Sequence, residues 1–462
     1  MAAITIDAVP GPRRAAGPVE RSRSTTRHHR HRYAPPPGLP RRGSHVSAGG
    51  SVLPGGAVTA VALADHALSA VPAVLTVVLV ARALEIPEFG GFALGCAVVS
   101  LALTLVRFAA GTRLAGIRDR ATVRRVTGDL VAATLVPASS AVVAVLVTIA
   151  VLPGDPPLGV LLALALVTPV VCVQDVTRLG ALACGRPDAA LVAGGVVVAV
   201  MVLPVASGIR PTPVLSVILW GAATAVGLVV TLRACGARSR LRHGAGVLRE
   251  PAARADPMVR GVLVAGLGTL WVLALASGVL GAASVGGLVG AAAAVAPVTV
   301  LVTGGPLVVA PELTHRRRLR DLPCCGAVAL VLAGTALGWG TFLLTLPDGV
   351  WEAAFGASGQ AVHDLLPWTV VVQFAVGVSA SATLGLAARG RGRAITAQAV
   401  AYTAVAVVAG TAAAVLTRDP VAVTASLAGA AAASAAVGWV HLTGSPEGPR
   451  PGRVPSRSAE ER

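Results

Sequence analysis

A few ionisable side chains stand inside long apolar runs of this 462-residue chain, and these are the residues whose types and spacing could do chemistry. Asp65 and His66 are adjacent in one run, Arg107 lies in the next, and Asp175 and Arg178 are three residues apart in another. An ionisable group at the centre of a membrane helix costs about 2.5–3.5 kcal/mol, so such groups usually face a cavity or a partner. Asp65 and His66 could take up a proton or bind a cation. This predicts an ion-coupling site, with a structural hydrogen bond to a neighbouring helix as the alternative.

Further polar residues are candidates for binding a substrate. Arg107 and Arg113 suit bidentate contact with phosphate, because a guanidinium presents a planar fork of donors. Arg178 shares a helix face with the acid three residues before it, so it could pair with that acid or contact a substrate. Gln174 and Gln373 are the best uncharged candidates for binding hydroxyl groups, and hydrogen bonds between helices are their alternative role.

The composition places these residues in a polytopic membrane protein. The chain is 55% hydrophobic and 13% charged, with a mean hydropathy of +0.77, whereas soluble domains carry about 25% charged residues. A helix needs about 20 apolar residues to cross a bilayer, and one such run follows another here. Runs such as "GVLLALALVTPVVCV" do not alternate polar with apolar residues, so the spans are expected to be helices and not barrel strands.

The apolar runs predict twelve spans, at approximately 57–82, 89–109, 127–152, 157–180, 187–207, 212–233, 261–282, 285–310, 325–346, 364–386, 394–416 and 420–441. The 38 basic residues are all Arg. With this span count, every Arg but Arg82, Arg210 and Arg418 falls on one side of the membrane. By the positive-inside rule, that side is the cytoplasm, and both termini lie there.

The spans divide equally about an Arg-rich segment. We expect a disordered basic cytoplasmic tail over 1–56, a six-helix lobe over 57–233, a cytoplasmic connector over 234–260, a second six-helix lobe over 261–441 and a cytoplasmic tail over 442–462. Two equal halves that both start in the cytoplasm indicate a parallel repeat, and transporters built this way bind substrate between the halves.

Catalysis and nucleotide hydrolysis are not expected. The chain has no Lys, which a Walker A loop needs, and we expect no cofactor and no bound metal. A polytopic glycosyltransferase would need acidic residues in sizeable external loops. Most external loops here are short, and the longest, "LPDGVWEAAFGASGQAVHD", is interpreted as a polar interfacial loop. The chain is therefore predicted not to be an enzyme.

Three stretches carry a family resemblance. The first runs from Asp65 to Phe108 and includes "ARALEIPEFGG"; the second is "QDVTRLGALACGRPDAAL" from Gln174; the third is "APVTVLVTGGPLVVAPELTHRRR" from Ala296. Together they resemble bacterial polysaccharide flippases, of the O-antigen or teichoic-acid type, in the multidrug/oligosaccharidyl-lipid/polysaccharide exporter superfamily. The rival major facilitator signature fails in register, because "GIRDRATVRR" places its Gly and Asp wrongly and lacks the second Gly.

The resemblance implies an all-α, V-shaped exporter fold of twelve transmembrane helices in two six-helix lobes. It implies that the protein flips a polyprenyl-pyrophosphate-linked glycan across the cytoplasmic membrane by alternating access, with Arg107 and Arg113 meeting the pyrophosphate. Drug exporters of the superfamily use a first-helix carboxylate for coupling, which supports that role for Asp65. The expected partners are the lipid-linked glycan, membrane lipids, and glycosyltransferases or a polymerase of the same pathway, and no nucleic acid.

Two alternatives stay open. One is a multidrug or small-molecule exporter of the same superfamily. The other is a non-transporting scaffold of a polysaccharide assembly complex, because intramembrane polar groups are so few. Aromatic residues, on which sugar rings usually stack, make up only 3% of the chain, so a small or neutral glycan is the expected substrate of such a flippase.

Overall fold

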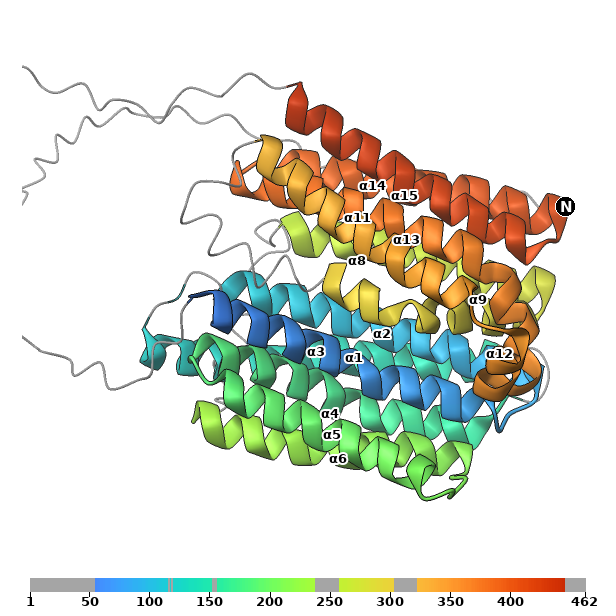
Figure 1. The fold of residues 1–462 in the computed structure, drawn as a ribbon, viewed down its shortest axis with the longest axis horizontal. Helices are drawn as coiled ribbons and strands as arrows, with labels where there is room; N and C mark the ends of the chain where they lie inside the picture. Colours follow the sequence, from blue (N-terminus) through green and yellow to red (C-terminus); the bar gives the residue numbers. More distant parts are fainter. Residues whose placement is uncertain are drawn as a thin grey trace, which may run out of the picture. The chain divides into compact units, whose positions relative to one another are not determined.

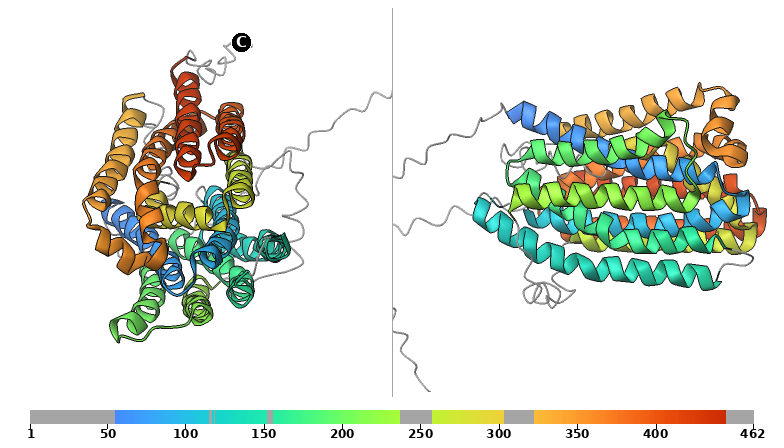
Figure 2. Two further views of the ribbon diagram at one scale, coloured as in Figure 1. Left: turned by 90° about the vertical axis from the view of Figure 1, so that its right-hand side faces the viewer. Right: turned by 90° about the horizontal axis from the view of Figure 1, so that it is seen from below.

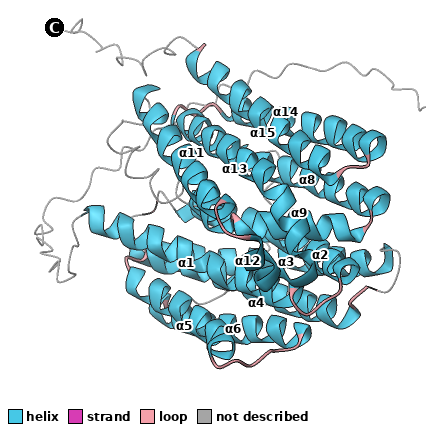
Figure 3. Cartoon of the chain, turned by 45° about the vertical axis from the view of Figure 1, so that its right-hand side comes forward, coloured by secondary structure: helices cyan, strands magenta, loops and turns pink. Residues whose placement is uncertain are grey.

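The protein is described from a computed structural model that covers residues 55–114, 117, 119–151, 156–236, 257–302 and 322–444. This part of the chain is helical and contains no strand (Figure 3). Within it, eleven helices are long and apolar enough to cross a membrane, and a bent pair adds a twelfth span when its two pieces are taken together. The prediction of an all-α, multi-pass membrane protein is confirmed, with eleven spans, or the predicted twelve when the bent pair counts as one.

The spans follow one another in the predicted order. The first six are α1 (Gly55–Ala81), α2 (Ile86–Leu114), α3 (Arg120–Val151), α4 (Leu158–Ala183), α5 (Pro187–Ala206) and α6 (Pro213–Cys235). The others are α8 (Pro257–Leu280), α9 (Ala282–Ala294) with its bent continuation, α11 (Leu322–Leu344), α13 (Gly359–Ala388), α14 (Gly392–Ala412) and α15 (Pro420–Thr443). The largest difference is at α3, which begins at Arg120 instead of residue 127. Hydropathy detects the apolar part of a helix and not the polar turns that extend it.

Local sequence explains where several helices start and stop. Thr212 and Asp419 precede a Pro at the first position of α6 and α15, and each side chain accepts a hydrogen bond from a backbone N–H in the first turn. Such caps satisfy donors that a helix start leaves unpaired, and Pro fits there because its missing N–H would be unpaired anyway. Gly236 ends α6 with a φ of 60°, the left-handed conformation that glycine adopts readily.

The span predicted at 285–310 is broken. α9 ends at Ala294, and the helix resumes over Ala296–Val302 at an angle of 62°. Pro297 accounts for the bend, because a Pro ring has no N–H to donate and clashes with the carbonyl four residues earlier. The remainder of this span lies outside the described residues.

Two groups of helices meet at α2. α1 to α6 pack mainly on one another, as do α8, α11, α13, α14 and α15, whereas α2 also packs along α9 and α8. Figure 1 shows the blue-to-green helices on one side, the orange-to-red helices on the other and α8 and α9 between them. The end-on view in Figure 2 shows the same order. The division into two lobes stays a prediction, and the predicted tails and connector 234–260 lie largely outside the described residues.

The loop predicted between the spans at 325–346 and 364–386 contains a short helix, α12 (Asp348–Phe355). Its Trp351 and Phe355 are buried, and it packs against α13 and α1. Asp348 lies 3.2 Å from His363 across the turn, and the Trp351 ring stacks on the same histidine. The expected polar loop therefore has an apolar face that fits over the α1–α2 end of the molecule.

The "EFGG" turn of α2 provides a close approach between the two groups. A Cβ built on Gly90 would lie 1.8 Å from the carbonyl oxygen of Ala282, at the start of α9. Nearby, a Cβ on Gly286 would lie 2.9 Å from the ring of Phe89. Only a glycine at position 90 lets the backbones of α2 and α9 come this close.

Gly90→Ala is therefore expected to separate α2 from α9 and to lower the apparent melting temperature by several degrees, since overpacking costs about 1–3 kcal/mol. Gly334→Ala, in α11, is the matched control, because a Cβ added to Gly334 would have no described atom within 4 Å. That change should be neutral or stabilising, as Ala favours helix by about 1 kcal/mol. Equal melting temperatures for the two variants would contradict the close approach.

Candidate functional site

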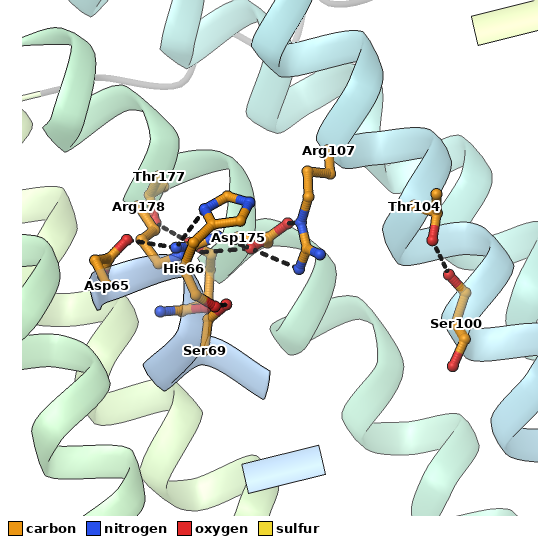
Figure 4. A network of polar contacts seen from close by, with 10 residues as sticks. Asp65, His66, Ser69, Ser100, Thr104, Arg107, Asp175, Thr177 and Arg178 are labelled. Carbon is orange, nitrogen blue, oxygen red and sulfur yellow. Dashed lines mark hydrogen bonds and ion pairs between the residues drawn. The ribbon is translucent and has the colours of Figure 1, made fainter. Parts of the chain in front are cut away.

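Four charged side chains from three helices form one ion-pair network (Figure 4). Arg178 of α4 donates to Asp65 of α1 through Nη1 and to Oδ1 of Asp175 through Nη2 at 2.8 Å. Arg107 of α2 donates to Asp175 through Nε at 3.0 Å and through Nη2 at 3.4 Å. The order is Asp65–Arg178–Asp175–Arg107, with two negative and two positive charges. The network joins α1, α2 and α4.

Burial differs along this network. Asp65, Asp175 and Arg178 are all at most 4% exposed, whereas the side chain of Arg107 is 13% exposed. In a low-dielectric interior, removing one member of an ion pair leaves an uncompensated buried charge and costs about 3–5 kcal/mol. Arg178, which bridges both acids, is thus the structural centre, and Arg107 is the most exposed member.

A cavity of about 350 Å³, here the first chamber, lies beside the network. Its polar lining includes one acid, Asp175, beside Ser69, Ser100, Arg107, Gln174, Arg178 and Gln373, and these residues come from α1, α2, α4 and α13. Apolar residues of α5, α6 and α9 complete its wall. Helices of both groups therefore meet around one space that is large enough for a drug-sized ligand.

Four of the five residues predicted to bind substrate line the first chamber: Arg107, Gln174, Arg178 and Gln373. Arg113 does not line it. This residue was expected in the loop after the second span, but α2 continues to Leu114 and places Arg113, exposed, in its last turn. The segment 109–114, "AAGTRL", is compatible with helix. The apolar run therefore ended at residue 109, before the helix itself did.

Asp65 and His66 lie behind the chamber and not on its surface. Both are fully buried, and Nδ1 of His66 is 3.5 Å from Nη1 of Arg178. Within the described part of the chain, Oδ1 of Asp65 and Nε2 of His66 have no hydrogen-bond partner. Asp65 thus keeps one unpaired acceptor oxygen. It lies next to the guanidinium of Arg178, which also lines the first chamber.

Sequence reasoning considered the pairing of Asp175 with Arg178, which the structure contains. It did not anticipate that Asp65 and Arg107 join the same network. The signal that could have shown this is how far each charged residue lies from its helix end. At 1.5 Å per residue, Asp65 is about 15 Å from the start of α1. Arg107 is about 11 Å from the end of α2, and Arg178 is about 8 Å from the end of α4. If successive helices alternate in direction, these three helix ends lie on the same side of the membrane, so the three residues lie at similar depths.

Gln373 is nine-tenths buried on the chamber wall, and no described residue donates to its Oε1. We expect Gln373→Leu to keep or raise the melting temperature, because an unpaired buried carbonyl costs about 1–3 kcal/mol, while slowing any transport through the first chamber. Gln398→Leu is the control. The amide of Gln398 bonds Ser379 and Thr383, so that variant should lose stability. A Gln373→Leu variant that melts earlier but transports normally would assign Gln373 to helix packing.

Comparison with solved structures supports this interpretation of the helices. The chain matches an inward-facing multidrug resistance transporter of the MATE family at a TM-score of 0.57 and 12% identity, over 83% of this chain and 97% of that one. An outward-facing MATE transporter also matches at a TM-score of 0.57, with 13% sequence identity over 85% of this chain and 96% of that one. The lipid II flippase MurJ, in an inward closed conformation, matches at a TM-score of 0.57, with 10% sequence identity over 84% of this chain and 87% of that one.

The fold is that of the MOP-superfamily transporters. The predicted fold class is confirmed by this likeness, and the proteins that share the fold here are transporters and flippases rather than enzymes. No family model and no curated protein sequence matches the chain. At 10–13% identity the MOP fold alone is shared, and the type of substrate has to be argued from the chamber.

Proposed function

We propose that the protein flips a lipid-linked glycan, carried on polyprenyl pyrophosphate, across the cytoplasmic membrane by alternating access. The observation that carries the proposal is the position of Arg107. Asp175 accepts from Nε and Nη2 of this guanidinium, and among the described residues none accepts a hydrogen bond from its Nη1. The side chain is therefore held in place by an acid while a donor remains for an anion in the first chamber.

The pyrophosphate is the group that this arrangement suits. Charge-assisted hydrogen bonds from Arg to phosphate are short and strong, and Nη1 is the donor that Asp175 leaves for one, since the acid occupies the Nε–Nη2 edge of the guanidinium. Gln174 and Gln373, on the same chamber wall, would bind hydroxyl groups of the first sugars. Both termini would lie in the cytoplasm, and pathway glycosyltransferases or a polymerase would be the protein partners.

A small-molecule exporter is the second candidate. The chamber volume of about 350 Å³ falls in the range that drug-sized ligands fill, and the MATE structures match as well as the flippase does. Reconstitution into liposomes with a fluorescent polyprenyl-pyrophosphate oligosaccharide separates the two. Movement of the label to the opposite leaflet supports flipping, efflux of cationic dyes without it supports the exporter, and neither activity supports a scaffold.

Ion coupling at Asp65 is part of the proposal. Protonation of Asp65 would break its ion pair with Arg178, so the proton would alter the network that holds Arg107. In wild type, a proton gradient of one pH unit is expected to change substrate distribution about tenfold per coupled proton. Asp65→Asn should abolish that response. Asp188→Asn, in an exposed Arg–Asp pair, is the control, and wild-type transport that ignores an imposed gradient would refute coupling.

A further inference from the structure

A second chamber lies next to the first, along α2. It has a volume of about 530 Å³ and is bounded by α2, α8, α9, α13 and α14, with one residue of α15. The two chambers share Ser100, Thr104, Val289, Ala292 and Thr299 as lining. They therefore meet along one face of α2 and the bent α9, which places the second chamber within reach of a ligand held at Arg107.

The polar groups of the second chamber bond to one another. Gln398 donates to the hydroxyl and carbonyl oxygens of Ser379 and accepts from Thr383 at 3.0 Å. The hydroxyls of Tyr402 and Thr269 lie 3.0 Å apart. Among the described residues that line the chamber, none is charged. Apart from Ser100, at the border with the first chamber, its surface thus presents apolar groups and polar groups that already make hydrogen bonds.

The first chamber differs in this respect. It contains the unshared Nη1 donor of Arg107 and the unpartnered Oε1 of Gln373. A ligand gains most free energy by bringing polar atoms to the first chamber and apolar atoms to the second. Polar atoms placed in the second chamber beyond Ser100 would lose their water and find only groups that are already hydrogen-bonded, which is unfavourable.

We infer that the second chamber binds the apolar chain of the substrate, in the segment next to the pyrophosphate, while the head group occupies the first chamber. This inference rests on the proposed function and adds the position of the lipid chain to it. A volume of about 530 Å³ suits a drug-sized apolar group and not a whole polyprenyl chain. The lipid chain therefore leaves the protein beyond this segment, and head and chain join where the two chambers adjoin along α2 and α9.

Photo-cross-linking tests the position of the chain. A polyprenyl-pyrophosphate disaccharide with a diazirine on an isoprene unit close to the pyrophosphate should label peptides of α8 and α14, such as those that contain Ala265 and Tyr402. Excess unlabelled polyprenyl-pyrophosphate disaccharide should compete. A phospholipid with a diazirine in its acyl chain should label these peptides weakly, and equal, uncompeted labelling by the phospholipid would overturn the assignment.

Filling the chamber tests its contribution to binding. Ala265 lines the second chamber from α8, and Ala274 lies on an exposed face of the same helix. Ala265→Phe should weaken binding of the long-chain lipid about tenfold, the ratio that excluding about two methylene groups produces, and leave binding of a short-chain analogue unchanged. Ala274→Phe should change neither. Val376→Phe, which fills the chamber from α13, provides a second variant if the first melts early.

The outcomes separate this inference from the proposed function. If Arg107-dependent binding and flipping persist while Ala265→Phe and Val376→Phe bind long and short lipids like wild type, the chain lies elsewhere and only the inference fails. If the wild-type protein neither binds nor moves any polyprenyl-pyrophosphate lipid, the proposed function fails and the inference with it.

Discussion

Arg107→Ala is expected to slow the proposed flipping of a lipid-linked glycan by about ten- to a hundredfold, with little loss of folded protein. A hydrogen bond to a charged group contributes about 1.5–3 kcal/mol, and each 1.4 kcal/mol is a factor of ten. The loss of stability should be smaller than for Arg178, because Oδ1 of Asp175 keeps two bonds from Arg178 while Oδ2 loses its bond from Arg107. The measurement is the initial rate of label movement in liposomes, beside binding of a soluble pyrophosphate analogue.

Two further variants make this result specific. Arg107→Lys keeps the charge but loses the planar fork, so it should recover only part of the activity. Arg186→Ala removes another arginine that contacts an aspartate through two nitrogens, but one that is half-exposed and outside the first chamber. It should transport like wild type. A fully active Arg107→Ala protein would remove the predicted contact with the pyrophosphate.

Arg178→Gln should have the largest effect on stability, about 3–5 kcal/mol, because it leaves two buried carboxylates without their shared cation. Arg178 is 1% exposed and bonds both Asp65 and Asp175. The apparent melting temperature in detergent should fall far more than in Arg107→Ala.

A double-mutant cycle checks that the loss comes from unpaired charge. Asp65→Asn combined with Arg178→Gln removes one negative and one positive charge, so the double variant should melt above Arg178→Gln alone. Such non-additivity is the signature of residues that interact directly. Additive losses would show that Arg178 stabilises the protein by packing and not through its acids.

The spans were predictable because the membrane imposes a simple rule on sequence. Apolar runs of about 20 residues mark the helices, and the order of all twelve spans followed from them. The rule says little about polar helix ends, which is why α3 starts earlier than expected and α2 ends later. The break after Ala294 was marked by Pro297, but a Pro inside a membrane helix is common enough that the bend could not be inferred from it.

The site was predictable only in part, since a sequence shows which residues are costly in a membrane and not which of them meet. The cost of burying Asp65 and Arg107 identified both as residues that need a partner. The actual partners come from another helix, α4, more than sixty residues further along the chain. The second chamber had no marker in the sequence, because Ser, Thr and Gln on helix faces look alike whether they line a cavity or join two helices.

The balance of charges in the Asp65–Arg178–Asp175–Arg107 network has an electrical consequence. Moving one elementary charge across the membrane potential involves about 2.3 kcal/mol per 100 mV. Because the network contains two positive and two negative groups, it can shift through the membrane field as a unit without electrical work. In the proposed transport cycle, the protein without substrate should therefore reorient at a rate that does not depend on voltage. Any voltage dependence of the transport cycle would then report the charge of what is bound, either the head group or the coupling proton.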